Sequence, residues 1–160
     1  MIVGILLPRI FPAGEVQVFA RAAARLAGLL TGSPVFPAQG MEGWVVSFVE
    51  APVVVTAACS ATDYFAIVSG LLGFHFARRW GRPLLAASVG LALALPLAIF
   101  VNAIRIVTVA HAHTWFIARL PATYETFLHM LMGAAIFLPS LIALNLALEI
   151  YGNHRRRLHT

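Results

Sequence analysis

The chain has 160 residues, of which 61% are hydrophobic and 11% are charged, and its mean hydropathy is +0.89. This composition excludes an ordinary soluble domain and indicates an integral membrane protein. The net charge is +5 because 11 Arg outnumber six acidic residues, and the chain has no Lys. The Arg lie mostly in short clusters beside apolar runs, which predicts membrane topology and no nucleic-acid partner. One Cys excludes an internal disulfide, and we expect a single integral membrane domain over residues 1–160.

Residues 1–58 are expected to form the interfacial and extracytoplasmic part of this domain. The segment Val16–Gly32 is apolar apart from one polar stripe at helical spacing, which contains Gln17, Arg21 and Arg25. It predicts a helix that lies in the membrane interface and ends at Gly32. Between residues 33 and 56, Pro and Gly interrupt the β-like runs WVVSFV and PVVVT, which predicts a small hairpin-like segment at the outer face.

Three apolar runs follow, and each is long enough to cross about 30 Å of hydrocarbon. They predict transmembrane helices at residues 59–77, 84–101 and 127–148. The fold class expected is therefore an all-α polytopic membrane protein with about three transmembrane helices, an N-terminal interfacial helix and the hairpin-like segment.

Arg clusters in short loops mark the cytoplasmic side of a membrane. One cluster, Arg78, Arg79 and Arg82, follows the first run, and another, residues 155–157, follows the third. The first span enters the cytoplasm, the second leaves it and the third returns, so both clusters lie on the same side of the membrane. We therefore expect a multi-pass protein of the cytoplasmic (inner) membrane with its C-terminus in the cytoplasm.

Three polar residues reach one depth on the outer side. At 1.5 Å per helical residue, Cys59 lies roughly 28 Å from Arg78, and Arg105 lies roughly 34 Å from Arg82. His129 lies roughly 33 Å from the end of its helix near Tyr151. A thiol, a guanidinium and an imidazole from three spans are thus predicted to converge at the outer interface.

These side chains could together catalyse acyl transfer. A thiolate is the nucleophilic form of Cys, and a nearby cation favours it, while His can return a proton to a leaving amine. Arg can hold the oxyanion of a tetrahedral intermediate. Each residue also has a structural interpretation: Cys59 as an apolar filler, His129 as a helix-end residue, and Arg105 as a side chain that snorkels to lipid phosphate.

Asp63 and three His residues are further candidates for the same site. Asp63 lies one turn after Cys59, where it could orient a partner or simply occupy a solvated helix start. His111, His113 and His129 fit a metal site poorly, because positions i and i+2 of a helix face apart and no acidic ligand accompanies them. We expect no metal and no organic cofactor.

The segments ACSATDYFAIVSGLLGF, LALALPLAIFVNAIRIVTVAH and HMLMGAAIFLP resemble the three signature regions of the exosortase/archaeosortase family of membrane transpeptidases. The family's Cys motif maps to Cys59, its Asn-x-x-Arg motif to Asn102 and Arg105, and its His-x-x-x-Gly motif to His129 and Gly133. The resemblance covers about residues 26–148, and the upstream part looks most like the small exosortase K type.

The resemblance implies a cysteine transpeptidase that cleaves a C-terminal sorting signal (PEP-CTERM-like) of exported, membrane-anchored proteins. Such a signal combines a recognition motif, a transmembrane helix and a basic cluster. Cys59 would form a thioester, His129 would serve as acid and base, Arg105 would stabilise the oxyanion, and Asn102 would orient Arg105. Beside the protein substrate, the lipid bilayer is the expected partner.

Two departures from the family pattern accompany the resemblance. Ala61 stands where the family usually has Gly, two residues after the Cys. Family members also usually have further spans before the Cys region, whereas few residues precede the interfacial helix here, which indicates a start codon assigned too late or a minimal member of the family. Two other functions stay open. One is a non-enzymatic membrane subunit whose polar residues mediate helix assembly, and the other is a cysteine protease that transfers the acyl group to water.

Overall fold

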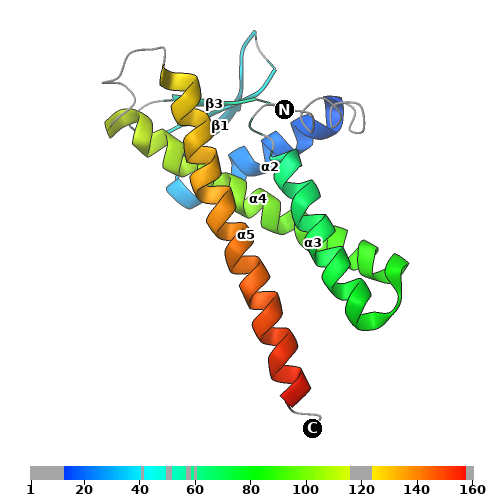
Figure 1. The fold of residues 1–160 in the computed structure, drawn as a ribbon. Helices are drawn as coiled ribbons and strands as arrows, with labels where there is room; N and C mark the ends of the chain where they lie inside the picture. Colours follow the sequence, from blue (N-terminus) through cyan, green and yellow to red (C-terminus); the bar gives the residue numbers. More distant parts are fainter. Residues whose placement is uncertain are drawn as a thin grey trace.

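The computed structural model describes residues 13–40, 42–49, 52–56, 59, 61–115 and 124–157. In chain order these form helix α2 (Ala13–Thr31), strands β1 (Val35–Pro37), β2 (Trp44–Ser47) and β3 (Pro52–Val55), and helices α3 (Thr62–Trp80), α4 (Pro83–Trp115) and α5 (Glu125–Arg157). The described chain is mostly helical with one small sheet, as the sequence predicted (Figure 1).

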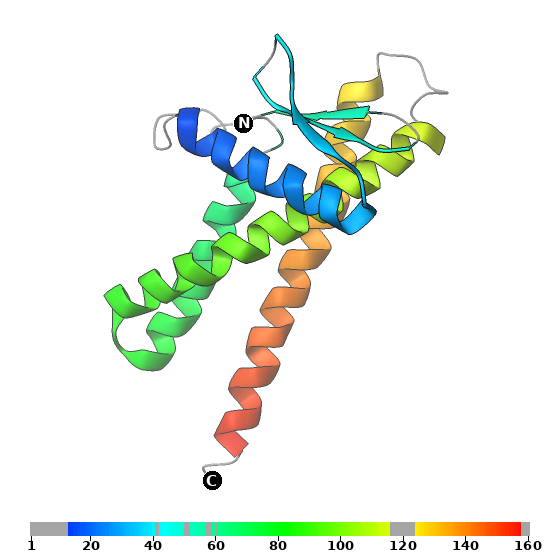
Figure 2. The same ribbon diagram turned by 180° about the vertical axis from the view of Figure 1, so that it is seen from behind.

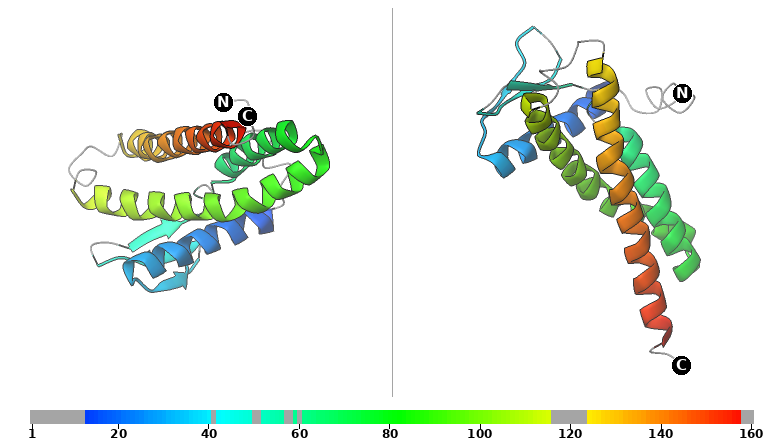
Figure 3. Two further views of the ribbon diagram at one scale, coloured as in Figure 1. Left: turned by 90° about the horizontal axis from the view of Figure 1, so that it is seen from below. Right: turned by 60° about the vertical axis from the view of Figure 1, so that its left-hand side comes forward.

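Helix α4 is the centre of the molecule. Viewed from below, it lies between α2 with the sheet on one side and α3 with α5 on the other (Figure 3). Two apolar clusters flank it: Ala103, Ile106 and Ala110 pack toward α2 and the sheet, whereas Ala94, Ala98 and Val101 pack toward α3 and α5. Polar residues of α4 that lie between these clusters are therefore held inside the protein.

Helix α2 buries a stripe of alanines at positions 20, 23, 24 and 27. Residues three and four apart share one helix face, and the small side chains let α2 pack closely on α4 and β2. Arg21 and Arg25 stay exposed on the opposite side, in agreement with the predicted polar stripe. The helix ends at Thr31, and Gly32 follows with φ 68°, as expected for a left-handed C-terminal stop.

The predicted hairpin is part of a three-stranded antiparallel sheet in the order β1-β2-β3. β2 pairs with β3 through Trp44↔Val55 and Val46↔Val53, and β1 adds a third strand through Val35↔Val46. The sheet lies at the end of the molecule where α5 begins, and the C-terminus lies at the far end (Figure 2).

Helices α3 and α4 form a hairpin whose contact is made by small residues. A Cβ placed on Gly90 would lie 2.8 Å from the backbone nitrogen of Gly73, so the two backbones approach as closely as glycine allows. The turn between the helices uses Gly81 at φ 63°, whose N–H donates to the carbonyl of Ala77 at 3.0 Å. The close approach holds α3 along the first half of α4.

Two described helical stretches are long and apolar enough to cross a membrane, Pro83–Ala112 in α4 and Met130–Tyr151 in α5. Helix α3, with Asp63 near its start and two Arg in its last turn, is not among them. The helix bounds differ from those of the predicted spans. Because α3 begins at Thr62, Cys59 precedes the helix, and α4 continues past residue 101, where Asn102 and Arg105 are buried in the protein.

Candidate active site

Cys59 lies in a short turn between β3 and α3. Its N–H donates to the carbonyl of Thr56 at 2.9 Å, and its side chain is partly exposed. Ala61 then takes a left-handed conformation, φ 56° and ψ 27°, which ends the turn and caps α3. Ala61 is the one non-glycine residue with positive φ in the described part of the chain. Glycine adopts this conformation without steric cost, which gives a conformational reason for the glycine that the resembled family usually has here.

Asn102 of α4 connects the central helix to this turn. Its side-chain amide donates to the carbonyl of Cys59 at 2.5 Å, and the residue is only 1% exposed. Its Oδ1 has no hydrogen-bond partner among the described residues. The resemblance implied that Asn102 orients Arg105, which stays a prediction. The hydrogen bond that the structure describes joins the Asn102 side chain to the backbone of Cys59.

Arg105 follows Asn102 by one helical turn and is 8% exposed. Its guanidinium carbon lies 5.3 Å from the centre of the Phe137 ring, within the range of a cation–π contact. A Cβ placed on Gly133 would lie 3.1 Å from Nε and 3.3 Å from Nη2 of Arg105. The guanidinium is thus held between α4 and α5, and this position removes the interpretation that Arg105 snorkels to lipid phosphate.

The Asn102 hydrogen bond joins the Cys59 turn to α4, one helical turn from Arg105. The turn and the guanidinium therefore lie in the same region of the molecule. The guanidinium presents several donors in a fixed plane, which suits the oxyanion that forms on a carbonyl oxygen when a sulfur attacks the carbonyl carbon.

Two other predicted site residues, His129 and Asp63, make no described contact with this group. His129 lies in α5 one turn before Gly133, and its side chain is outside the described part of the structure. Asp63 is exposed in the first turn of α3, and no hydrogen bond or ion pair joins it to another described residue. The structure thus brings together Cys59, Asn102, Arg105 and Gly133, but it does not bring Asp63 to them.

Sequence reasoning missed the support beneath Arg105. The Phe137 ring stacks on that of Tyr64 with centroids 4.7 Å apart, and the Tyr64 hydroxyl lies 2.7 Å from Oγ of Ser140. Positions 129, 133 and 137 recur every four residues, so they share one face of α5. That spacing was a usable signal for Phe137.

The described residues offer no metal centre, because no three His, Cys, Asp or Glu side chains gather at one point within them. The buried polar groups of the site are an amide and a guanidinium. Arg supplies only hydrogen-bond donors, so the site is better suited to an anionic oxygen than to a cation.

A comparison with protein families places most of the chain in one of them. The family described as "Transmembrane exosortase (Exosortase_EpsH)" matches residues 3–146. Searches of curated proteins and of solved structures returned no match.

Proposed function

Because the chain belongs to the transmembrane exosortase family, we propose that it is a membrane-embedded cysteine transpeptidase. Its substrates would be exported proteins that carry a C-terminal sorting signal of the PEP-CTERM-like kind. The convergence of Cys59, Asn102, Arg105 and Gly133 from three separate segments carries this proposal.

In the proposed reaction, the Cys59 thiolate attacks the carbonyl carbon of the scissile peptide bond. Negative charge develops on the carbonyl oxygen, where the Arg105 guanidinium donates hydrogen bonds. The C–N bond breaks, and protonated His129 gives its proton to the leaving amine on the membrane-anchored tail. An amine acceptor, deprotonated by His129, then attacks the thioester and releases Cys59.

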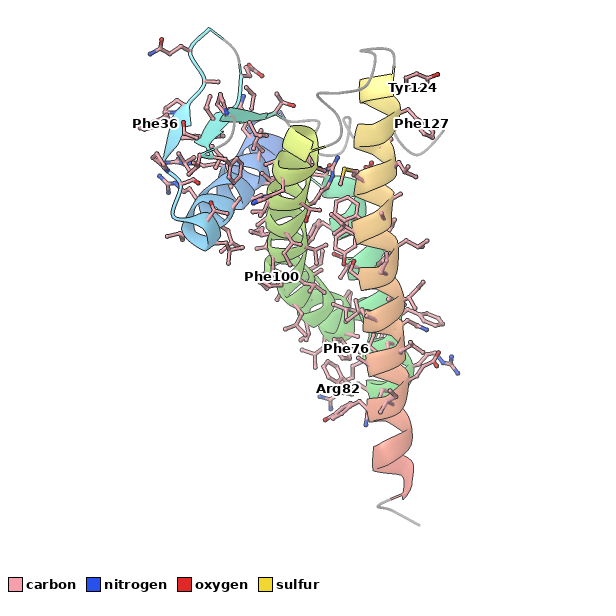
Figure 4. All side chains as sticks on the ribbon, turned by 90° about the vertical axis from the view of Figure 1, so that its left-hand side faces the viewer. Phe36, Phe76, Arg82, Phe100, Tyr124 and Phe127 are labelled. Atoms are coloured by element: carbon pink, nitrogen blue, oxygen red, sulfur yellow. The ribbon has the colours of Figure 1, made fainter. Side chains whose placement is uncertain are left out.

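The arrangement in the membrane is part of the proposal. We infer three spans, with α3 crossing beside α4 and α5, and an active site on the outer side. Residues at the two ends support two interfaces, since Tyr and Trp gather where bilayer meets water and Arg marks the cytoplasmic side. Exposed Tyr124 lies toward the end that carries the sheet, and Arg82 lies toward the other (Figure 4).

Opposite the sheet, Arg79 lies over the Tyr151 ring at 5.1 Å, and Phe76 stacks on Trp80. Arginine and aromatic side chains at the same depth support a cytoplasmic interface at this end. The C-terminus would then face the cytoplasm of a bacterial-type inner membrane, with the tail of the substrate released beside it.

No observation of the structure favours either alternative, the non-enzymatic membrane subunit or the hydrolysing cysteine protease. A subunit that uses polar residues for assembly would present them to a partner helix, whereas Asn102 and Arg105 are turned into their own chain. Hydrolysis differs from transfer only in the acceptor. The mass of the processed product separates the two, because hydrolysis leaves a free carboxylate and transfer leaves an amide or ester.

The test uses a reporter protein with a tripartite sorting signal taken from a protein of the same genome. Cleavage in membranes is measured and normalised to enzyme level by immunoblot. We expect Cys59→Ala and His129→Gln to abolish cleavage at unchanged abundance. His111→Gln is the matched control, because His111 is exposed on α4 and its Nδ1 lies 2.9 Å from its own helix carbonyl at Val107. Normal cleavage by Cys59→Ala would eliminate the proposed nucleophile.

A further inference from the structure

Strand β3 is an edge strand that leads directly into the candidate active site. The sheet order is β1-β2-β3, so one side of β3 has no neighbouring strand among the described residues. After β3 ends at Val55, the carbonyl of Thr56 accepts the N–H of Cys59. Strand β3 therefore leads into the turn that carries Cys59.

The hydrogen-bonding pattern shows which groups of β3 face this open edge. Ser47 N–H donates to the carbonyl of Pro34, and Ala38 N–H donates to that of Gly43, so odd-numbered residues of β2 direct their backbone toward β1. Backbone groups alternate along an antiparallel ladder, and therefore Trp44 and Val46 bond to β3.

The register completes the assignment. Trp44 pairs with Val55 and Val46 pairs with Val53, so Val53 and Val55 direct their backbone groups toward β2. The N–H and C=O of Val54 point the opposite way, to the open edge. No hydrogen bond from another described residue reaches them.

The edge is only partly protected against pairing. Natural edge strands are blunted by charges, bulges or prolines. The sequence of β3 is Pro-Val-Val-Val: Pro52 offers no N–H to the open edge, whereas the three valines that follow carry no charge. The outer face next to it is also apolar, because Phe36, Val45 and Val54 align across the three strands. Phe36 is 53% exposed and Val54 is 38% exposed.

We propose that the open edge of β3 binds the recognition segment of the protein substrate as an added β-strand. This proposal rests on the proposed function, because it takes the ligand to be a peptide that Cys59 cleaves. A thiol reaches a peptide carbonyl in an extended, unfolded segment. Strand addition gives affinity through main-chain hydrogen bonds and specificity through alternate side chains. Here Val54 supplies the main-chain contact, the apolar row receives alternate side chains, and the strand direction delivers the next peptide bond to Cys59.

Cross-linking in membranes tests the location. In a Cys59→Ala background, the new thiol of Val54→Cys is paired with a single Cys placed in the recognition segment of the reporter. Phe36→Cys in the same background is the matched control, since it lies on the same face of the sheet but on the opposite edge strand. We expect at least tenfold more disulfide with the reporter at position 54.

A kinetic test addresses the main-chain contact. Val54→Pro removes the outward N–H and leaves the ladder bonds of Val53 and Val55 in place, whereas Val54→Thr keeps the N–H and the branched shape. The ratio of kcat/KM for reporter cleavage between these variants isolates the hydrogen bond, and we expect at least tenfold. The alkylation rate of Cys59 by iodoacetamide should be equal in the two, because neither variant alters the turn.

Three outcomes would overturn the proposal: equal kcat/KM for the proline and threonine variants, equal cross-linking at positions 36 and 54, or a disulfide-linked homodimer through position 54 in place of the reporter adduct. Should Val54→Pro lower abundance, the cross-linking result decides alone. Failure of the proposed function is distinguishable, because it would show as normal cleavage by Cys59→Ala whatever happens at position 54.

Discussion

Gly133 gives the sharpest test of the role of Arg105, because glycine at this position leaves space for the guanidinium. A Cβ at residue 133 would lie 3.1 Å from Nε, 3.3 Å from Nη2 and 3.4 Å from Cζ of Arg105. Ordinary contacts between such atoms lie at about 3.5–4.0 Å. The guanidinium of Gly133→Ala must therefore move by a few tenths of an ångström, and Phe137 on its other face limits where it can go.

This displacement sets the expected magnitude. A misplacement of about 1 Å can cost about 100-fold in rate, so a displacement of about 0.3–0.4 Å should cost about fivefold, or about 1 kcal/mol of transition-state stabilisation. Gly133→Leu needs a larger movement and should cost about 100-fold or more. Stability should not fall with activity in Gly133→Ala, because alanine favours a helix over glycine by about 1 kcal/mol.

The assay is reporter cleavage in membranes at several substrate levels, with enzyme abundance measured by immunoblot. Gly70→Ala is the matched control, since its added methyl group meets nothing within 4 Å and it gains the same helix propensity. A Gly133→Ala enzyme within about twofold of wild type, at equal abundance, would show that the position of the guanidinium does not limit the rate.

Three further predictions use the same membranes and reporter. Arg105→Lys keeps the charge but loses the planar donors, so cleavage should fall about 100-fold at normal abundance, and a value within threefold would place Arg105 outside the mechanism. Ala61→Gly should retain full cleavage, whereas Ala61→Val should lose abundance, because a branched residue at φ 56° is strained by about 1–3 kcal/mol. Gly90→Ala should lower the melting temperature in detergent, since its methyl group meets the backbone of Gly73 at an overpacking cost of about 1–3 kcal/mol, and equal melting of the Gly90 and Gly70 alanine variants would contradict this.

Hydropathy and local stop signals predicted most of the helical architecture. Gly32 ended α2 as expected, and the runs around Trp44 and Pro52 paired as an antiparallel hairpin. These features are set by residues that lie close together in the chain, so the sequence alone is enough to predict them. Strand β1 was missed because it is only three residues long and ends in proline, so its pairing depends on β2 rather than on its own propensity.

The ends of α3 and α4 were predicted less well because they depend on tertiary contacts. Asn102 and Arg105 interrupt an apolar run, and a polar pair in such a run suggests the end of a membrane span. In the structure α2, α3 and α5 cover this part of α4, and its polar groups are buried inside the protein. Hydropathy measures each residue against lipid or water and carries no information about a neighbouring helix.

The same limit applied to the site. Asn102 and Arg105 are three residues apart and so share one face of a helix, but spacing within a helix cannot show which other segment that face meets. The amide of Asn102 meets the carbonyl of Cys59, and Arg105 meets Gly133 and Phe137. The grouping of the three motifs was predicted from their common depth, whereas the partner of each side chain required the fold.

The turn that carries Cys59 is fixed at three successive points without belonging to a long helix or strand. Thr56 accepts its N–H, Asn102 donates to its carbonyl, and the left-handed Ala61 sets the direction in which α3 leaves. A nucleophile must be held within about 0.5 Å of its productive position by surrounding groups. A cysteine that only fills space needs none of these constraints. The combined cost of a buried amide and a left-handed alanine is therefore best explained by a requirement to position this thiol, which is the reason to expect Cys59 variants to lose cleavage before they lose stability.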